Sequence, residues 1–278
     1  MGAGIAADDC RGRWVLGDLR LQHAWRSVAR AALQRRLTWR LAEVTQLVAE
    51  TPRVRSLLLR VPGWPGHRAG QHTDVRLTAE DGYTAERSYS IASAPDAGEQ
   101  LTLTVERLDE GEVSPYLTEE LRIGDQLELR GPIGGYFVWD LELGGPLMLI
   151  AGGSGICPLM AMLRRRASAS SQVPTRLLYS SRTQEDIIYR EELDRLGAAG
   201  SGLQVIPTLT RVQPPDWTGH SGRIDQAMLN DVAWSPSDHP LIYVCGPTAL
   251  VEHVADALVS LGHDPERVKT ERFGPSGG

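Results

Sequence analysis

The chain has 278 residues, a formal net charge of −6 and a pI of about 5.7, a charge balance that argues against a general nucleic-acid binder. Its hydrophobic and charged contents, 41% and 23%, are those of a globular protein with enough chain for two domains. No apolar run reaches the length of a membrane span, and acidic and arginine residues interrupt any signal-peptide pattern. The three cysteines lack the spacing of a disulfide framework, a zinc site or an iron–sulfur cluster, so we expect a cytoplasmic protein without a metal.

Residues 1–36 differ in composition from the rest of the chain and are predicted to form a basic N-terminal extension. Within it, Ala24 to Leu37 has the spacing of a basic amphipathic helix, with Trp25, Val28 and Leu33 able to share one face. A partner-binding arm, a packing helix and a solvated extension all fit this pattern, and the sequence does not choose among them.

Residues 37–143 have the pattern of β-structure, with short alternating runs separated by turn signals. Leu101, Leu103 and Val105, for example, alternate with threonines and predict a strand with one buried face. Six short strands at this spacing predict a small antiparallel barrel interrupted by one helix: strands 38–47, 53–61, 71–77, 86–92, 101–108 and 126–129, and a helix at 114–121.

Residues 144–278 alternate strand and helix patterns instead. Leu147 to Ala151 is a continuous apolar run, which is typical of a parallel strand buried on both faces. The segments that follow predict a doubly wound parallel-sheet α/β domain: a helix to residue 166, strands 176–180, 203–209 and 241–245, and helices 189–196 and 248–261.

The stretch Arg87-Ser88-Tyr89-Ser90 carries an unusual set of side chains for a plain strand. Alternation puts Arg87 and Tyr89 on one face, where a guanidinium suits a diphosphate and a phenol suits a flat ring. Ser90 could then offer its hydroxyl to a polar atom of that ring. An ordinary edge strand with a surface arginine and a half-buried tyrosine would show the same residues.

Gly111-Glu112-Val113-Ser114-Pro115 lies between two barrel strands and has the pattern of a helix start. Ser114 is a favourable N-cap and Pro115 a favourable first helical residue, so free backbone N–H groups are predicted there. Such a helix start, with Gly111 allowing close approach, suits a diphosphate. A capped helix that binds nothing is the alternative.

Two further motifs follow strands of the α/β half. Gly152-Gly153-Ser154-Gly155-Ile156-Cys157-Pro158 opens a helix, but Pro158 stands where the usual dinucleotide fingerprint has its last glycine. Cys245-Gly246-Pro247 ends the last predicted strand, at the sheet edge where ligands of such folds bind. A small buried thiol is the other interpretation of Cys245.

Together these motifs resemble the ferredoxin–NADP reductase-like flavoenzymes. The resemblance covers about 37–274 and is carried by Arg-x-Tyr-Ser (87–90), Gly-x-x-Ser (111–114), Gly-Gly-x-Gly-x-x-Pro (152–158) and Cys-Gly-Pro (245–247), in the family's order. It implies an FAD-binding barrel followed by an NAD(P)-binding domain. It also departs from the family at Cys157, where alanine is usual; that thiol is either sensitive to oxidation or inert packing.

The resemblance implies a role for each motif. The FAD diphosphate would contact Arg87 and the 111–114 loop, and the flavin ring would lie on Tyr89 beside Ser90 and under an aromatic near the C-terminus. The catalytic residues would be Ser90, near flavin N5, and Cys245, near the nicotinamide. The implied cofactor-binding residues are Arg87, Ser88, Tyr89, Ser90, Gly111, Val113, Ser114 and Phe273 for FAD, and Gly153, Gly155, Pro158, Cys245, Gly246 and Pro247 for the pyridine nucleotide.

The choice between NADP(H) and NAD(H) is predicted from the strand ends at Thr210-Arg211 and Ser181-Arg182. In the family a hydroxyl–arginine pair at the first of these positions often binds the 2′-phosphate of NADPH, and Arg is a fixed cation suited to a phosphate. Tyr189 would stack on the adenine. Asp186 lies nearby and solvated arginines would look the same, so NADPH is favoured over NADH without excluding dual use.

The sequence thus predicts an FAD-dependent NAD(P)H oxidoreductase whose protein part holds and tunes the cofactors. The cysteine-rich segment of reductases with a fused [2Fe–2S] domain does not occur, so we expect electrons to pass to a separate acceptor. A ferredoxin, a haem protein, a molybdenum enzyme and an oxygenase component all remain open as that acceptor. The alternatives are a flavin or ferric-chelate reductase, and a flavin- and nucleotide-binding regulatory subunit with little turnover.

Overall fold

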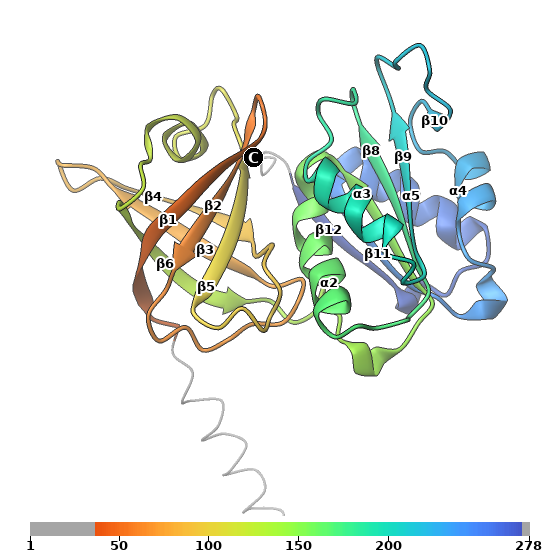
Figure 1. Ribbon diagram of the computed structural model, residues 1–278, viewed down its shortest axis with the longest axis horizontal. Helices are drawn as coiled ribbons and strands as arrows, with labels where there is room; N and C mark the ends of the chain where they lie inside the picture. The colour runs from red at the N-terminus through yellow and green to blue at the C-terminus, as the bar shows by residue number, and fades with distance from the viewer. Residues whose placement is uncertain (1–36, 274–278) are drawn as a thin grey trace, which may run out of the picture. The chain divides into compact units, whose positions relative to one another are not determined.

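The computed structural model describes residues 37–273 (Figure 1), so the predicted N-terminal extension and its helix lie outside the described residues. Both sheets belong to one compact unit that begins at Trp39. Among the described residues, no helix is long and apolar enough to cross a membrane.

The first sheet is an antiparallel barrel. Its six strands follow the spatial order β4-β3-β6-β1-β2-β5, and an isolated bridge between Ile91 and Leu103 joins its two ends. Alternate residues of each strand point inward, so apolar side chains of all six strands form one cluster, to which β4 contributes Ala85 and the others mainly leucines and valines. The strands are β1 (Trp39–Thr51), β2 (Val54–Arg60), β3 (His72–Thr78), β4 (Thr84–Ser90), β5 (Gln100–Glu106) and β6 (Gln126–Ile133).

The second sheet is parallel, with the order β10-β9-β8-β7-β11-β12. The order reverses between β7 and β11, which is the point where ligands bind in doubly wound sheets. All six residues of β7 are buried, as its continuous apolar run predicts. The strands are β7 (Leu147–Gly152), β8 (Thr175–Ser181), β9 (Leu203–Leu209), β10 (His220–Ser221), β11 (Leu241–Pro247) and β12 (Val268–Phe273).

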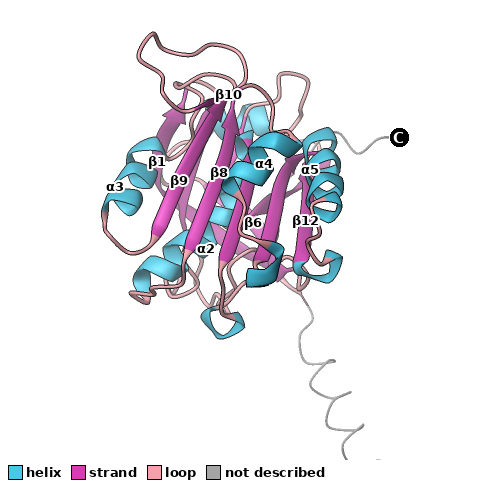
Figure 2. Ribbon diagram, turned by 90° about the vertical axis from the view of Figure 1, so that its right-hand side faces the viewer, coloured by secondary structure: helices cyan, strands magenta, loops and turns pink. Residues whose placement is uncertain are grey.

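Helices cover both faces of this sheet (Figure 2). Helices α2 (Ile156–Ser168) and α3 (Arg190–Ala198) contribute to one apolar cluster, whereas α4 (Gln226–Val232) and α5 (Thr248–Ser260) contribute to the other. The fold class predicted from the sequence, a barrel followed by a doubly wound α/β sheet, is confirmed.

Among the strands and α-helices of residues 37–273, three were not predicted: β10, α4 and β12. The two residues of β10 are too few to give a periodic pattern. The seven-residue α4 starts at Asp225, whose side chain accepts a hydrogen bond from the Met228 N–H at 2.8 Å. The sequence of β12, Val-Lys-Thr-Glu-Arg-Phe, is mostly polar because this strand lies at the edge of the sheet.

Candidate functional site

Strand β4 presents different residues on its two faces. Arg87 and Tyr89 lie opposite Val75 and Thr73 of β3 on one face of the sheet; the Tyr89 ring packs on the barrel core, whereas the Arg87 side chain is more than half exposed. Ser88 points to the other face, where its hydroxyl donates to Asp74 Oδ1 at 2.7 Å. The Ser88 hydroxyl thus has its acceptor lone pairs left for a cofactor, and its cofactor-binding role stays a prediction.

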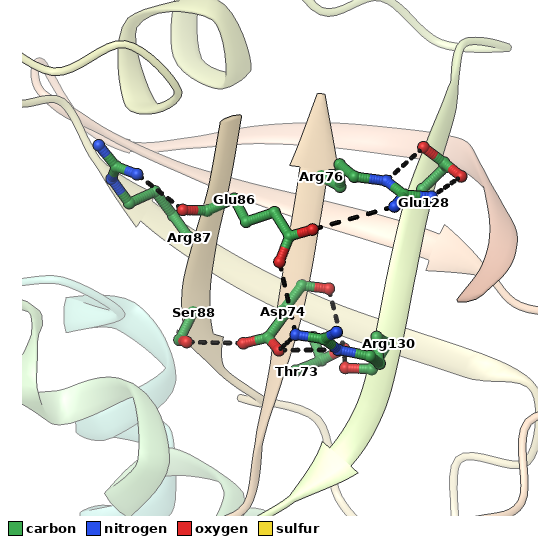
Figure 3. Close-up of polar contacts among 8 residues, drawn as sticks. All are labelled: Thr73, Asp74, Arg76, Glu86, Arg87, Ser88, Glu128 and Arg130. Atoms are coloured by element: carbon green, nitrogen blue, oxygen red, sulfur yellow. Dashed lines mark hydrogen bonds and ion pairs between the residues drawn. The ribbon is translucent and has the colours of Figure 1, made fainter. Parts of the chain in front are cut away.

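The outer face of β4 is fixed by a charged network (Figure 3). The Arg130 Nε and Nη2 atoms donate to Asp74 Oδ2 at 3.1 and 2.8 Å, and Nη2 lies 3.4 Å from Glu86. Burial raises the pKa of Asp74, but the hydrogen bonds from Ser88 and Arg130 outweigh burial and hold that pKa below its usual value. The network ties the strand that carries Arg87 and Tyr89 to β3 and β6.

Ser90 ends β4 with a hydroxyl that has no hydrogen-bond partner although it is buried. A buried hydroxyl left unpaired costs free energy, so such an atom is expected to meet a ligand. Its cross-strand neighbour is His72, a half-buried side chain whose pKa is lowered by burial. The adjacent Tyr89 packs on the barrel core, and burial raises the pKa of its phenol. The end of β4 thus carries a flat neutral ring on Tyr89 and an unpaired hydroxyl on Ser90, the two groups that the flavin hypothesis requires there.

Arg87 and the loop 111–114 lie together, as the diphosphate hypothesis requires. Arg87 Nη2 is 3.4 Å from Glu112 Oε2, and both side chains are more than half exposed. The other oxygen of Glu112 accepts from the Tyr83 hydroxyl at 3.1 Å. Glu112 was not singled out from the sequence, because its partner Arg87 lies 25 positions away in the chain.

The predicted helix start at Ser114 is confirmed, but the predicted cap is not. Ser114 and Pro115 are the first helical residues, the turn continues as a π-helix over Tyr116–Glu120, and no side chain caps it. Ser114 is buried, and its hydroxyl accepts a hydrogen bond from the Leu108 N–H at 3.1 Å instead. The Val113 side chain belongs to the barrel core. Any diphosphate contact of this loop would therefore come from backbone groups near Gly111 and not from a capped helix.

The glycine-rich turn and the Cys-Gly-Pro segment touch backbone to backbone. A Cβ added at Gly155 would lie 2.2 Å from the Cys245 carbonyl oxygen, and one at Gly246 would lie 3.1 Å from Gly152 N. Gly153 has a φ of +53° and its carbonyl accepts from the Tyr179 hydroxyl at 3.1 Å. Pro158 is buried in α2, so its part in the motif is to pack the helix start.

Cys245 lies at the end of β11 beside Glu271 of β12, with Sγ 3.9 Å from Oε2. Burial raises the pKa of the Glu271 carboxyl to about 7 and, together with that carboxyl, raises the pKa of the Cys245 thiol. Phe273 is the last residue of β12 and lies opposite Pro247 of β11. Sequence reasoning singled out Phe273 but not Glu271, whose partner Cys245 lies 26 positions away in the chain.

Cys157 is buried in α2, with its thiol 3.8 Å from the Thr104 carbonyl oxygen. Burial raises the pKa of this thiol to about 12. Because only the thiolate reacts readily with oxidants, the structure favours inert packing over an oxidation-sensitive site.

The ends of β8 and β9 also lie side by side. The Thr210 N–H and hydroxyl donate to the Ser181 carbonyl at 2.9 and 3.2 Å, and the Arg211 N–H donates to the Arg182 carbonyl at 2.9 Å. Both arginine side chains are exposed, whereas Ser181 is buried. The two predicted cation positions therefore share one edge of the sheet.

Tyr189 does not lie where an adenine could stack on it. Only 3% of the residue is exposed, and its hydroxyl hydrogen-bonds to Thr104 of β5. The guanidinium of Arg164 covers the ring, 4.9 Å from its centroid. The adenine-stacking prediction for Tyr189 is corrected on these grounds.

The sequence matches two family profiles, "Oxidoreductase FAD-binding domain" over residues 40–138 and "Oxidoreductase NAD-binding domain" over residues 149–256. Among curated relatives, it is 33% identical over 209 residues to a glycine betaine monooxygenase reductase subunit of Chromohalobacter salexigens, covering 74% of this chain and 56% of that protein. It is also 33% identical over 210 residues to ferredoxin–NADP reductase B of Sorangium cellulosum, covering 74% of this chain and 84% of that protein. The chain thus spans little more than half the length of the first relative.

Solved structures of similar proteins have the same fold. The FAD/NAD-binding domain of a nitric oxide dioxygenase from Vibrio cholerae superposes with a TM-score of 0.76 at 26% identity, covering 86% of this chain and all of that one. An Amycolatopsis cytochrome P450 reductase, GcoB, superposes with a TM-score of 0.74 at 27% identity, covering 88% of this chain and 73% of that one.

Proposed function

The chain belongs to the ferredoxin–NADP reductase-like family of FAD- and NAD-binding oxidoreductases, and from this premise we propose that it passes electrons from NAD(P)H through FAD to a separate acceptor. The observation that carries the proposal is the buried, unpaired hydroxyl of Ser90 at the end of the strand that also presents Arg87 and Tyr89. FAD would supply hydride acceptance and one-electron release. The chain's own residues bind, orient and enclose it.

The barrel supplies the flavin contacts in this proposal. Ser90 donates a hydrogen bond at the edge of the ring, and Tyr89 packs beside the ring as a neutral phenol. Arg87 provides the cation for the diphosphate, and backbone groups near Gly111 line the same anion. Burial of Ser90 and Tyr89 excludes water from the ring edge, which strengthens the hydrogen bond.

The α/β half supplies the nucleotide contacts. Gly153 leaves room for the nucleotide beyond β7, because the nearest atom to an added Cβ is Glu106 Oε2 at 3.9 Å, whereas Gly155 lets the turn pack directly on the Cys245 carbonyl. A protonated Cys245 thiol and Glu271 carboxyl would place neutral hydrogen-bonding groups near the nicotinamide. In this scheme residues 37–143 form the FAD-binding domain and residues 144–278 the NAD(P)-binding domain, with Phe273 as the aromatic near the flavin.

NADPH is the preferred donor in this proposal, because Arg211 and Arg182 lie on one sheet edge next to Thr210 and Ser181. The test is steady-state reduction of an artificial acceptor with each nucleotide, for wild type and Arg211→Ala. The variant should lose roughly 5- to 30-fold in kcat/KM with NADPH, as expected for an exposed phosphate contact of about 1–2 kcal/mol, and little with NADH. Equal losses with both nucleotides, or a wild type that strongly prefers NADH, would remove these residues from the phosphate site.

An oxygenase component is the acceptor class we favour. The support is the names of relatives: a glycine betaine monooxygenase reductase subunit and a propane 2-monooxygenase reductase component are both similar to this chain. A ferredoxin, a haem protein and a molybdenum enzyme are the remaining classes. We place the protein in the cytoplasm, where the free thiols of Cys157 and Cys245 would stay reduced.

The deciding experiment is the visible spectrum of the purified protein before and after adding NADPH or NADH. Retained FAD should give a yellow protein that bleaches with either nucleotide. A colourless protein that takes up no FAD would overturn the proposal. A protein that binds flavin only as a substrate would indicate a flavin or ferric-chelate reductase, and one that retains FAD but is not reduced would indicate a regulatory subunit.

A further inference from the structure

We infer that Arg164 is a positioning residue that holds the nucleotide-binding helix against the flavin-binding strand and so sets the distance between the two reacting rings. Arg164 lies in α2, the helix that begins directly after the glycine-rich turn. Its Nη1 donates to the carbonyl oxygen of Ala92 at 2.8 Å. Ala92 follows Ser90 by two residues, so one guanidinium connects the two half-sites. The inference rests on the proposed function.

The remaining donors of Arg164 fix the orientation of its guanidinium. Nε and Nη2 donate to the two carboxylate oxygens of Glu192 in α3 at 2.9 and 2.6 Å. This bidentate arrangement requires a planar fork, which lysine does not have. Only 20% of the Arg164 side chain and 28% of that of Glu192 are exposed. The contact with Ala92 is therefore made by a side chain with little freedom to move.

Tyr189 is the third residue of this arrangement, and the contacts of its side chain hold its backbone in an unfavourable conformation. Its ring lies under the Arg164 guanidinium, and its backbone has a φ of 60°, a conformation that bulky residues rarely adopt. Its hydroxyl reaches Thr104 of the barrel, whose own hydroxyl lies 2.7 Å from that of Ser56. A chain of buried polar groups thus runs from β2 and β5 to the start of α3.

The position of α2 matters because Gly155, at its N-terminal end, packs on the Cys245 carbonyl. A shift of the helix would move the nucleotide turn relative to the strand that ends in Ser90. Transfer between two bound groups requires the reacting atoms to lie about 3–3.5 Å apart, and a displacement of about 1 Å can cost roughly 100-fold in rate. Loss of the Arg164 contact would therefore slow reduction while leaving both cofactors bound.

The experiment compares Arg164→Ala and Arg164→Lys with wild type, using the full chain loaded with FAD. Arg195→Ala is the matched control, because Arg195 is exposed and its Nε donates only within its own helix, to Glu191 O at 3.3 Å. Three quantities are measured: FAD content, the dissociation constant for NADP⁺, and the long-wavelength absorbance of nicotinamide stacked on flavin. The rate of flavin reduction by NADPH is then followed by stopped flow.

Arg164→Ala should keep its FAD and bind NADP⁺ within about 3-fold of wild type, yet lose most of the long-wavelength absorbance and roughly 10- to 100-fold in reduction rate. Arg164→Lys should fall between the two, and Arg195→Ala should match wild type. If Arg164→Ala does not fold, the test uses Arg164→Lys and Tyr189→Phe instead, the latter of which removes one hydroxyl. Both should lower the long-wavelength absorbance and the reduction rate. Variants that match wild type in absorbance and rate, or that lose FAD in proportion to rate, would overturn the inference. A wild type that retains no FAD would instead overturn the proposed function on which it rests.

Discussion

Removing the carboxylate of Glu112 should tighten FAD binding, although Glu112 lies inside the proposed diphosphate site. The side chain now pairs with Arg87 at 3.4 Å and accepts a hydrogen bond from Tyr83. A bound diphosphate would bring its negative charges to the same guanidinium. Glu112 would then have to leave Arg87 or share it, and both cost free energy.

The magnitude follows from exposure and distance. Because both side chains are more than half exposed, the ion pair itself contributes about 0–1 kcal/mol. Two like charges roughly 4 Å apart in water-like surroundings repel by about 1 kcal/mol. Glu112→Gln should therefore tighten FAD by about 1–2 kcal/mol, or roughly 5- to 30-fold in Kd. Arg87→Ala should act in the opposite direction by about 1.5–3 kcal/mol, the range of a charge-assisted hydrogen bond.

The assay is titration of flavin-free protein with FAD, followed by quenching of flavin fluorescence, at low and high salt. Riboflavin, which has no diphosphate, serves as the ligand control, and Glu110→Gln as the protein control, because Glu110 is an exposed acid of the same loop. The gain for Glu112→Gln should shrink at high salt, where exposed charges are screened. A weaker FAD complex in Glu112→Gln, or an equal change for riboflavin, would refute the reasoning.

Three other predictions concern the same site. Asp74→Ala leaves Arg130 and Ser88 without their shared partner and should cost about 1–3 kcal/mol, a fall of several degrees in Tm that thermal unfolding would detect; an unchanged Tm would mean that the network does not support β4. Phe273→Ala should strengthen the long-wavelength absorbance on adding NADP⁺ if the aromatic side chain must move for nicotinamide to enter, and an identical titration would exclude that role. Glu271→Gln should remove a fall in stability between pH 4.5 and about 7, measured by urea unfolding.

The sequence was sufficient to predict the two sheets because their patterns are local. Alternation along Leu101 to Val105 and the apolar run Leu147 to Ala151 each report burial of the strand that carries them. Three of the four motifs were placed on the correct strand ends, and the fourth, 111–114, in the loop after β5, for the same reason, since strand, turn and helix signals are read within about ten residues. What those motifs contact could not be read this way.

Tyr189 and Ser114 show where local reasoning fails. Tyr189 stands at a helix start, where an exposed ring is a reasonable expectation, but its hydroxyl meets Thr104, 85 positions away in the chain. Its left-handed backbone conformation, at a cost on the order of 1–3 kcal/mol, is tolerated only because the buried contacts around it compensate. Ser114 is an equally good N-cap by pattern, yet its hydroxyl serves the Leu108 N–H because the loop folds back on itself. Glu112, Arg164 and Glu271 were missed because each acquires its role from a residue distant in the sequence.

The stability of the folded chain should decrease with pH as the Glu271 carboxyl ionises. Burial favours the neutral carboxyl, so its pKa rises from 4.5 to about 7 in the folded chain. A raised folded-state pKa contributes stability that is complete below pH 4.5 and is lost as pH rises through about 7, by roughly 3 kcal/mol in total. Stability of wild type relative to Glu271→Gln should therefore fall across that window and be flat on either side. Unfolding midpoints of both proteins, measured at equal FAD concentration, give the difference in stability between them. The contributions of other titrating groups are the same in both proteins and cancel. A difference that is constant with pH would mean that water or Cys245 solvates the carboxylate well enough to keep it charged in the folded protein.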